Sequence, residues 1–224
     1  MKTMHASAAF AAMFVLGSVS LGDVIQSESF ENYSVGSGAF VDENTDSHAL
    51  QNYDDHTING DNWNVWFEST GGSGFSDGDY FGVSSYTGGG IGAYTDGVQG
   101  YQMGDTDGEV TMTFDAVDGA TGVRLDLFVR STGWENTDLI NITFGDAVLL
   151  DTTGVDINND FSYLEGVWTT LEVAGSGQLV IKFASNASSE SIAFDNIQWT
   201  GVPAPGALAL LGLAGLASRR RRRD

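Results

Sequence analysis

The sequence predicts an all-β protein whose body, residues 23–200, folds as a jelly-roll β-sandwich between an N-terminal signal helix and a C-terminal hydrophobic helix. Two observations lead to this prediction. Apolar and polar residues alternate with a period of two along several segments, as they do in half-buried strands. Turn signals such as Gly145-Asp146 separate these segments, and no helical pattern of useful length interrupts them. Short strands at this spacing are typical of a sandwich or a jelly roll.

The clearest strand is predicted at residues 123–130. Val123, Leu125, Leu127 and Val129 share one face of this strand, and the residues between them share the other. Five further strands are predicted by the same alternation: Glu109–Phe114, Leu139–Phe144, Val167–Val173, Gln178–Phe183 and Ser191–Trp199.

Residues 71–108 are rich in glycine and carry regularly placed aromatic side chains. A disordered linker is one interpretation of this composition. Aromatic side chains need a surface to pack on, however, and linkers contain few of them. We therefore expect short strands joined by long loops in this segment.

Charge is distributed unevenly along the chain. Six of the 9 basic residues lie in the end segments, so the body keeps only Arg124, Arg130 and Lys182 against 29 of the 30 acidic residues, a formal charge of about −26. A surface this negative repels phosphate backbones, which excludes nucleic acid as a partner. It suits a protein that faces a salty exterior or one that binds divalent cations. The absence of cysteine excludes disulfides and thiol chemistry.

Residues 1–22 have the three parts of a secretory signal peptide. Lys2 supplies the charged start, Ala6–Val19 the apolar stretch, and Ser20 and Gly22 the small residues before a cleavage site. The apolar stretch is short for a membrane span of about 20 residues. The segment therefore predicts export by the Sec machinery.

The last segment, residues 201–224, has three ordered features. A proline-containing breaker comes first, the apolar segment Ala207–Ala217 follows, and a basic cluster comes last. The breaker consists of Val202, Pro203, Ala204, Pro205 and Gly206, and the cluster consists of Arg219, Arg220, Arg221, Arg222 and Arg223. An apolar helix followed by arginines is a stop-transfer arrangement with the arginines on the cytoplasmic face. Because the helix is short for a lasting span, we expect transient anchoring in the inner membrane.

This tail resembles the PEP-CTERM sorting signal, whose usual pattern is Val-Pro-Glu-Pro, an apolar helix and an arginine cluster. Ala204 stands where the glutamate usually stands. The resemblance implies cleavage near the Pro-x-Pro motif by an exosortase-type enzyme, a Gram-negative-type envelope, and a link to extracellular polysaccharide. An ordinary C-terminal membrane anchor is the alternative.

The two ends of the body resemble those of galactose-binding-like jelly-roll domains, a superfamily that includes many carbohydrate-binding modules. The resembling segments are Ser29-Phe30-Glu31 and residues 192–197. In this superfamily a carboxylate from each end takes part in a calcium site, which implies a structural Ca²⁺ at Glu31 and Asp195. The alternative is that Glu31 is solvated and that Asp195 caps a turn.

Trp63 and Trp66 are candidate platforms for stacking against a sugar ring. The two residues lie three apart, so on a strand they face opposite ways, and at most one of them is a platform. Aromatic side chains belong to the core more often than to a binding site, so a core role is the alternative for each.

The body contains no recognisable catalytic motif, neither a Gly-x-Ser-x-Gly elbow nor a His-Glu-x-x-His or phosphate-binding pattern. We therefore expect a non-enzymatic protein, secreted or held at the cell surface, with a structural or adhesive role in the extracellular matrix. A carbohydrate-binding module is the second hypothesis, and a secreted glycosidase is the third.

Overall fold

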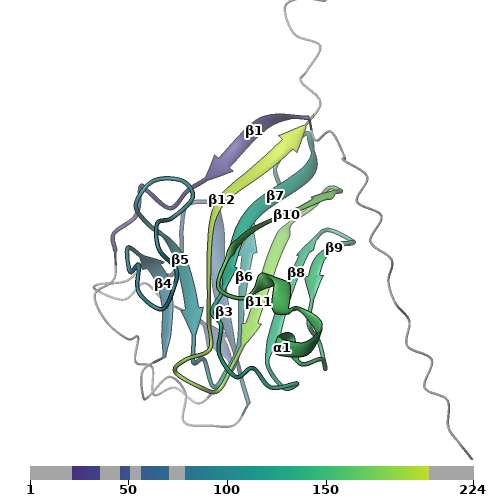
Figure 1. Cartoon of the computed structure of the whole chain (residues 1–224). Coiled ribbons are helices and arrows are strands. Elements are labelled where there is room, and N and C mark those ends of the chain that lie inside the picture. Colours follow the sequence, from purple (N-terminus) through teal and green to yellow (C-terminus); the bar gives the residue numbers. More distant parts are fainter. Residues whose placement is uncertain (1–21, 36–45, 51–56, 71–78, 202–224) are drawn as a thin grey trace, which may run out of the picture.

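A computed structural model describes residues 22–35, 46–50, 57–70 and 79–201, which form a β-sandwich of two antiparallel sheets (Figure 1). The predicted all-β class is therefore confirmed. The segments predicted to form the two flanking helices lie outside the described residues, apart from Gly22 and Gly201. No helix within the described ranges combines the length and the apolar character that a membrane span requires.

The first sheet has the strand order β10-β7-β12-β5-β4, and β1 pairs with β12. Its strands are β1 (Asp23–Glu28), β4 (Tyr80–Ser84), β5 (Gly100–Gly104), β7 (Ala120–Val129), β10 (Trp168–Ala174) and β12 (Ser191–Gly201). The long strand β12 pairs with β5 through its first residues and with β1 through its last. This pairing sets Asp23 directly opposite Gly201, so the two ends of the body lie side by side (Figure 1).

The second sheet has the strand order β2-β3-β6-β11-β8-β9. Its strands are β2 (His48–Ala49), β3 (Trp63–Ser69), β6 (Gly108–Phe114), β8 (Leu139–Phe144), β9 (Ala147–Asp151) and β11 (Leu179–Ala184). Two short helical turns, α1 (Ile157–Asp160) and η1 (Ser162–Leu164), lie between β9 and β10. The side chain of Asp156 caps α1 by accepting a hydrogen bond from the backbone N–H of Asn159.

The core lies between the two sheets, where their inward side chains meet. The four apolar residues predicted to share one face of β7 are all fully buried. Strand β8 matches its predicted range, and the other five predicted strands differ from theirs by one to three residues at either end. The period-two alternation therefore located these strands correctly.

The outer face of the first sheet is covered by the loop that joins β4 to β5, residues 85–99, here called the covering loop. Its buried residues and the sheet residues beneath them form a second hydrophobic cluster of Ile91, Tyr94, Phe128 and Ala193, with Trp168 packed against it. The indole N–H of Trp168 donates to the carbonyl of Ile91 at 2.9 Å. Alternation alone placed Phe128 on the outer side of its strand, but the covering loop leaves it only 1% exposed.

Candidate functional site

The outer face of the second sheet carries the exposed tryptophan of the chain's Trp-Asn-Val-Trp segment. Trp63 is 3% exposed and packs in the core with its ring centroid 5.4 Å from that of Tyr101. Trp66 is 43% exposed and points to the other side of β3. The predicted opposite orientation of the two residues is therefore confirmed, and only Trp66 offers a ring face to solvent.

Strand register places Trp66 at one end of a polar row that crosses the second sheet. Trp66 lies opposite Thr111, and Lys182 lies on the far side of Thr111. Asn141 and Asp151 continue the row across β8 and β9. Because neighbouring strands lie about 4.8 Å apart, these five positions span roughly 20 Å. An indole thus begins a row of hydrogen-bonding side chains.

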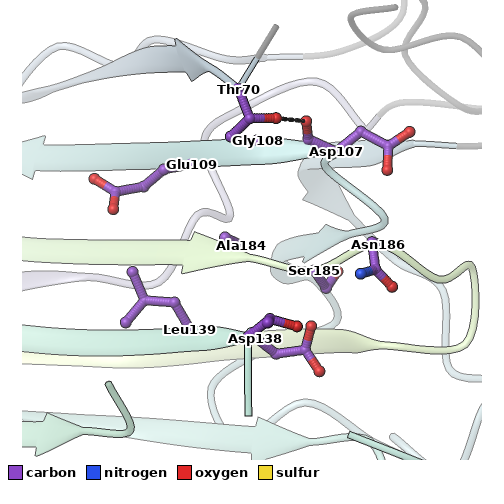
Figure 2. A pocket seen from close by; sticks show the side chains of 10 residues that line it. Thr70, Asp107, Gly108, Glu109, Asp138, Leu139, Ala184, Ser185 and Asn186 are labelled. Atoms are coloured by element: carbon purple, nitrogen blue, oxygen red, sulfur yellow. Dashed lines mark hydrogen bonds between the residues drawn. The ribbon is translucent and has the colours of Figure 1, made fainter. Parts of the chain in front are cut away.

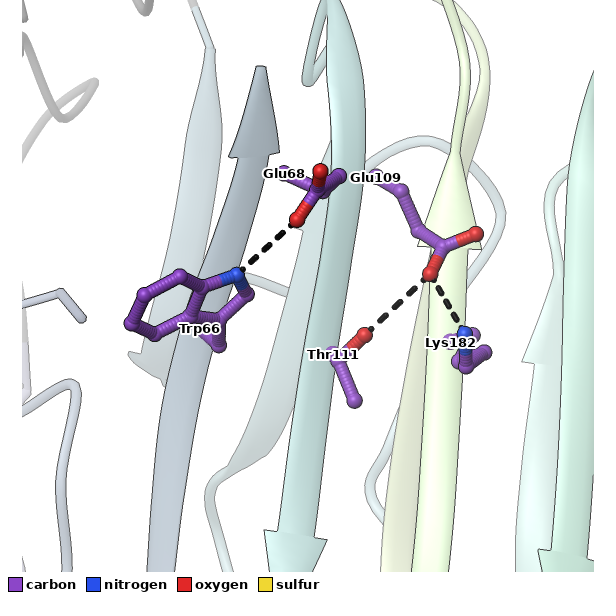
Figure 3. A network of polar contacts seen from close by, with 5 residues as sticks. All are labelled: Trp66, Glu68, Glu109, Thr111 and Lys182. Atoms are coloured by element: carbon purple, nitrogen blue, oxygen red, sulfur yellow. Dashed lines mark hydrogen bonds and ion pairs between the residues drawn. The ribbon is translucent and has the colours of Figure 1, made fainter. Parts of the chain in front are cut away.

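Hydrogen bonds hold the side chains around Trp66 in place (Figure 3). The indole N–H of Trp66 donates to Glu68 Oε2 at 3.2 Å. Lys182 Nζ donates to Glu109 Oε1 at 2.6 Å, and the hydroxyl of Thr111 donates to the same oxygen at 3.4 Å. The lysine also balances the charge of Glu109. This bond lies at the edge of the Trp66 ring and does not cover its face, and the side chain is 43% exposed.

A pocket of about 370 Å³ opens at the end of this face, where β6, β8 and β11 meet their loops (Figure 2). Leu139 and Ala184 give it an apolar floor, and Glu109 belongs both to the pocket and to the network beside Trp66. Its remaining lining residues are Thr70, Asp107, Gly108, Thr137, Asp138, Ser185 and Asn186. The volume lies within the usual range for small-ligand sites, about 300–1,000 Å³.

Three carboxylates gather at one edge of the pocket. Glu135, Asp138 and Glu190 each place an oxygen within 4.8 Å of the others, and they form the one such group of three found in the described ranges. Burial and the charge of Asp138 raise the pKa of Glu190 to about 7. Burial and then the charge of Glu135 raise the pKa of Asp138. The set offers the oxygen ligands that a divalent cation takes, and without a cation its members repel one another.

The structure brings Glu31 and Asp195 to the same segment, the end of the covering loop. Glu31 Oε1 accepts the backbone N–H of Val98 at 2.7 Å and that of Gln99 at 3.0 Å. Asp195 Oδ2 accepts the backbone N–H of Asp96 at 2.7 Å. These contacts fasten the loop to β12 and to the segment after β1.

The predicted calcium site at Glu31 and Asp195 fits these contacts poorly. Asp195 Oδ2 also accepts the hydroxyl of Thr95, and its Oδ1 accepts the backbone N–H of Asn196. Three donors therefore already use most of the roughly four acceptor positions of the Asp195 carboxylate. Burial raises the pKa of Asp195 to about 6, and these donors partly offset the effect of burial. The pair belongs to no group of three closely spaced ligand side chains in the described ranges. Calcium at this pair stays a prediction.

The processing residues predicted at the tail, Val202–Gly206 and the five arginines, lie outside the described residues. Sequence reasoning also missed the pocket. Its residues come from β6, β8, β11 and four loops, and only the fold unites them. One sequence feature pointed to this region, the acidic Asp-Thr-Asp-Gly stretch at residues 105–108. In the structure Asp105 and Asp107 adopt positive φ values of 53° and 45° there. A tight acidic turn of this kind often borders a site.

Several solved structures resemble this one in fold. The K2 cleaved adhesin domain of Lys-gingipain is 16% identical with a TM-score of 0.42, and the match covers 69% of this chain and 97% of that domain. TmCBM61, solved with β-1,4-galactotriose, is 11% identical with a TM-score of 0.36, and the match covers 63% of this chain and 89% of that one. The family 11 carbohydrate-binding module of Clostridium thermocellum was solved with a β-1,3-1,4-mixed-linked tetrasaccharide. It is 13% identical with a TM-score of 0.33, and the match covers 70% of this chain and 96% of that one.

TM-scores below 0.5 are too low to transfer a ligand or an activity to this chain. No family model and no curated protein sequence matches it. The resemblance of the tail to the PEP-CTERM signal therefore stays a prediction, and the function has to be argued from the surface of the sandwich.

Proposed function

We propose that this protein is a non-enzymatic, exported domain of jelly-roll type that binds extracellular polysaccharide through the outer face of its second sheet. The observation that carries the proposal is Trp66, which is 43% exposed at the start of a polar row. The resulting role is adhesive: the domain would attach a cell surface or a matrix to a glycan.

The chemistry of this face suits a sugar. A pyranose has a flat C–H face, which packs against an aromatic ring, and a rim of hydroxyls, which need donors and acceptors in the plane around it. Trp66 provides the ring, and Glu68, Thr111 and Lys182 provide polar atoms beside it.

The charge of the body narrows the class of glycan. With a formal charge of about −26, the domain repels polysaccharides that carry carboxylate, sulfate or phosphate groups. Lys182 does not offset this repulsion because it is paired with Glu109. The ligand we propose is therefore a neutral polysaccharide.

The test is a glycan-array and calorimetric binding assay on residues 23–201. We expect Trp66→Ala to abolish binding and Trp66→Phe to keep part of it. Tyr163→Ala is the matched control, because Tyr163 is an aromatic residue that is even more exposed than Trp66, at 63%, and lies away from this face, on η1. If Trp66→Ala and Tyr163→Ala bind glycan as the parent does, the proposed face is not the binding site.

Export is the second part of the proposal. We infer that the Sec machinery exports the chain and that an exosortase-type enzyme cuts it near Pro203 and Pro205. The pairing of Asp23 with Gly201 supports this, because it sets side by side the two ends of the described body, each of which is next in sequence to a predicted processing segment. Mass spectrometry of the mature termini tests it, with Pro203→Ala/Pro205→Ala as the uncut variant. A mature protein that retains both end segments would disprove processing.

A further inference from the structure

The pocket and Trp66 are neighbours on the same sheet face. Glu68 and Glu109 are directly opposite each other in β3 and β6, and Trp66 is opposite Thr111. Trp66 and Glu109 are therefore diagonal neighbours, with Cα atoms on the order of 7–8 Å apart. Since Glu109 lines the pocket, one sugar unit is enough to reach from the indole to the pocket.

Hydrogen bonds tie together the loops that border the pocket at the strand ends, on the side away from Trp66. The loop after β11 is tied to the turn before β6, since the backbone N–H of Asp107 donates to the carbonyl of Ser185 at 3.0 Å. The hydroxyl of Thr70 donates to the carbonyl of Asp107 at 2.9 Å from the end of β3 (Figure 2). The backbone N–H of Asp105 adds a bond of 3.3 Å to the carbonyl of Glu190. These bonds hold the loops beside the ends of β6 and β11 in fixed positions around the pocket.

The lining of the pocket is rich in acceptors. Carboxylates of Glu109 and Asp138 and the side-chain oxygen of Asn186 line the pocket, above an apolar floor of Ala184 and Leu139. A carboxylate accepts two vicinal hydroxyls at once. A sugar ring with several free hydroxyls matches this set, and a chain terminus has more free hydroxyls than an internal unit.

We propose that the pocket binds the terminal unit of a neutral glycan chain while the next unit stacks on Trp66. This inference rests on the proposed function and adds that the domain recognises the ends of glycan chains. It predicts that oligosaccharides with free ends bind and that a cyclic glycan of the same sugar does not.

The experiment compares pocket and platform variants against neutral gluco-, galacto-, xylo- and manno-oligosaccharides of two to six units. Ala184→Phe fills the pocket from its floor and leaves Trp66 untouched. Val180→Phe is the matched control, because Val180 lies on the same face of β11, away from the pocket. We expect Ala184→Phe to weaken binding about tenfold or more, and Val180→Phe to change it less than about twofold.

Thermal melting of each variant shows first that it is folded. If Trp66→Ala loses binding while Ala184→Phe keeps it, the pocket does not bind the chain end, although the face still binds glycan. Equal affinity for a cyclic glycan and for its linear form would also show that the pocket does not bind a chain end. If the parent domain binds no member of the neutral series, the proposed function itself is wrong.

Discussion

The carboxylate of Asp195 accepts a hydrogen bond of 2.7 Å from the backbone N–H of Asp96, 99 residues earlier in the chain. Glu31 makes the corresponding bonds to Val98 and Gln99. Together the two carboxylates fasten the end of the covering loop over the aromatic side chains on the outer face of the first sheet. The loop keeps that face closed, so the second sheet is the one that presents its tryptophan.

Removing the Asp195 carboxylate should loosen the covering loop. Asp195→Ala leaves the N–H groups of Asp96 and Asn196 without an acceptor, and a buried donor without a partner costs about 1–3 kcal/mol. We expect the free energy of unfolding to fall by roughly that amount in urea denaturation. We also expect amide hydrogen exchange to accelerate at residues 95–99.

Asp146→Ala is the control for this variant, because Asp146 is an exposed turn residue. It should change the free energy of unfolding by less than about 0.5 kcal/mol. Unchanged exchange at residues 95–99 in Asp195→Ala would contradict the role assigned to this carboxylate.

Removing metal ions should not change the stability of the domain through Glu31 and Asp195. Both carboxylates already accept backbone N–H groups, so part of their acceptor capacity is used by the protein itself. We expect the melting temperature to be the same in calcium and in EDTA. A clear fall in EDTA would show a bound cation. Asp195→Ala and Glu190→Gln, measured in calcium and in EDTA, would then show which carboxylates hold it.

Stability should fall as the pH rises toward about 7. Glu190 has a pKa of about 7 in the folded protein, against an ordinary value of 4.5. Between these values the folded state keeps a proton that the unfolded chain has released, so the free energy of unfolding decreases with increasing pH. Asp195, with a pKa of about 6, acts in the same direction at lower pH. Urea denaturation from pH 5 to pH 8 measures this slope.

Glu190→Gln cannot ionise, and it should lose less stability than the parent over this pH range. At pH 8 we expect the variant to be the more stable of the two, because the repulsion with Asp138 is gone. Glu172→Gln, at an exposed position of β10, is the matched control and should follow the parent. If the free energy of unfolding of Glu190→Gln changes with pH as that of the parent does, the raised pKa assigned to Glu190 is wrong.

The turn between β8 and β9 should not tolerate a side chain at Gly145. Its φ is +56°, and a Cβ built there lies 2.1 Å from the carbonyl oxygen of Ser176. We expect Gly145→Ala to lower the free energy of unfolding by more than about 1 kcal/mol. Gly133→Ala should be close to neutral, since a Cβ at Gly133 meets nothing within 4 Å. Equal melting temperatures for the two variants would contradict this account.

Alternation along the chain was enough to find six strands because burial on one face of a sheet leaves a local signature. Strand β7 shows both the strength and the limit of this signal. Its inward residues, such as Leu125, are buried as predicted, while Phe128 on the other side is also buried. A second covering layer comes from a distant loop, and a period of two carries no information about it.

The candidate site, too, was predictable from the sequence only in part. The three-residue spacing of Trp63 and Trp66 required opposite faces, but it did not say which ring would be exposed. That choice depended on which side of β3 met Tyr101 and the rest of the core. Glu31 and Asp195 both contact the end of the covering loop through backbone N–H groups, and the calcium site predicted for them stays a prediction.

By itself the sequence determined the all-β class, the location of six strands, the acidic character of the body and the opposition of the two tryptophans. These are local properties, since composition and period are read from neighbours along the chain. The tertiary structure alone decided which sheet face stays open, how Asp138 and Glu190 come together, and where a pocket forms beside Trp66. Such features depend on strand order and on loops that meet across the fold, which no local pattern encodes.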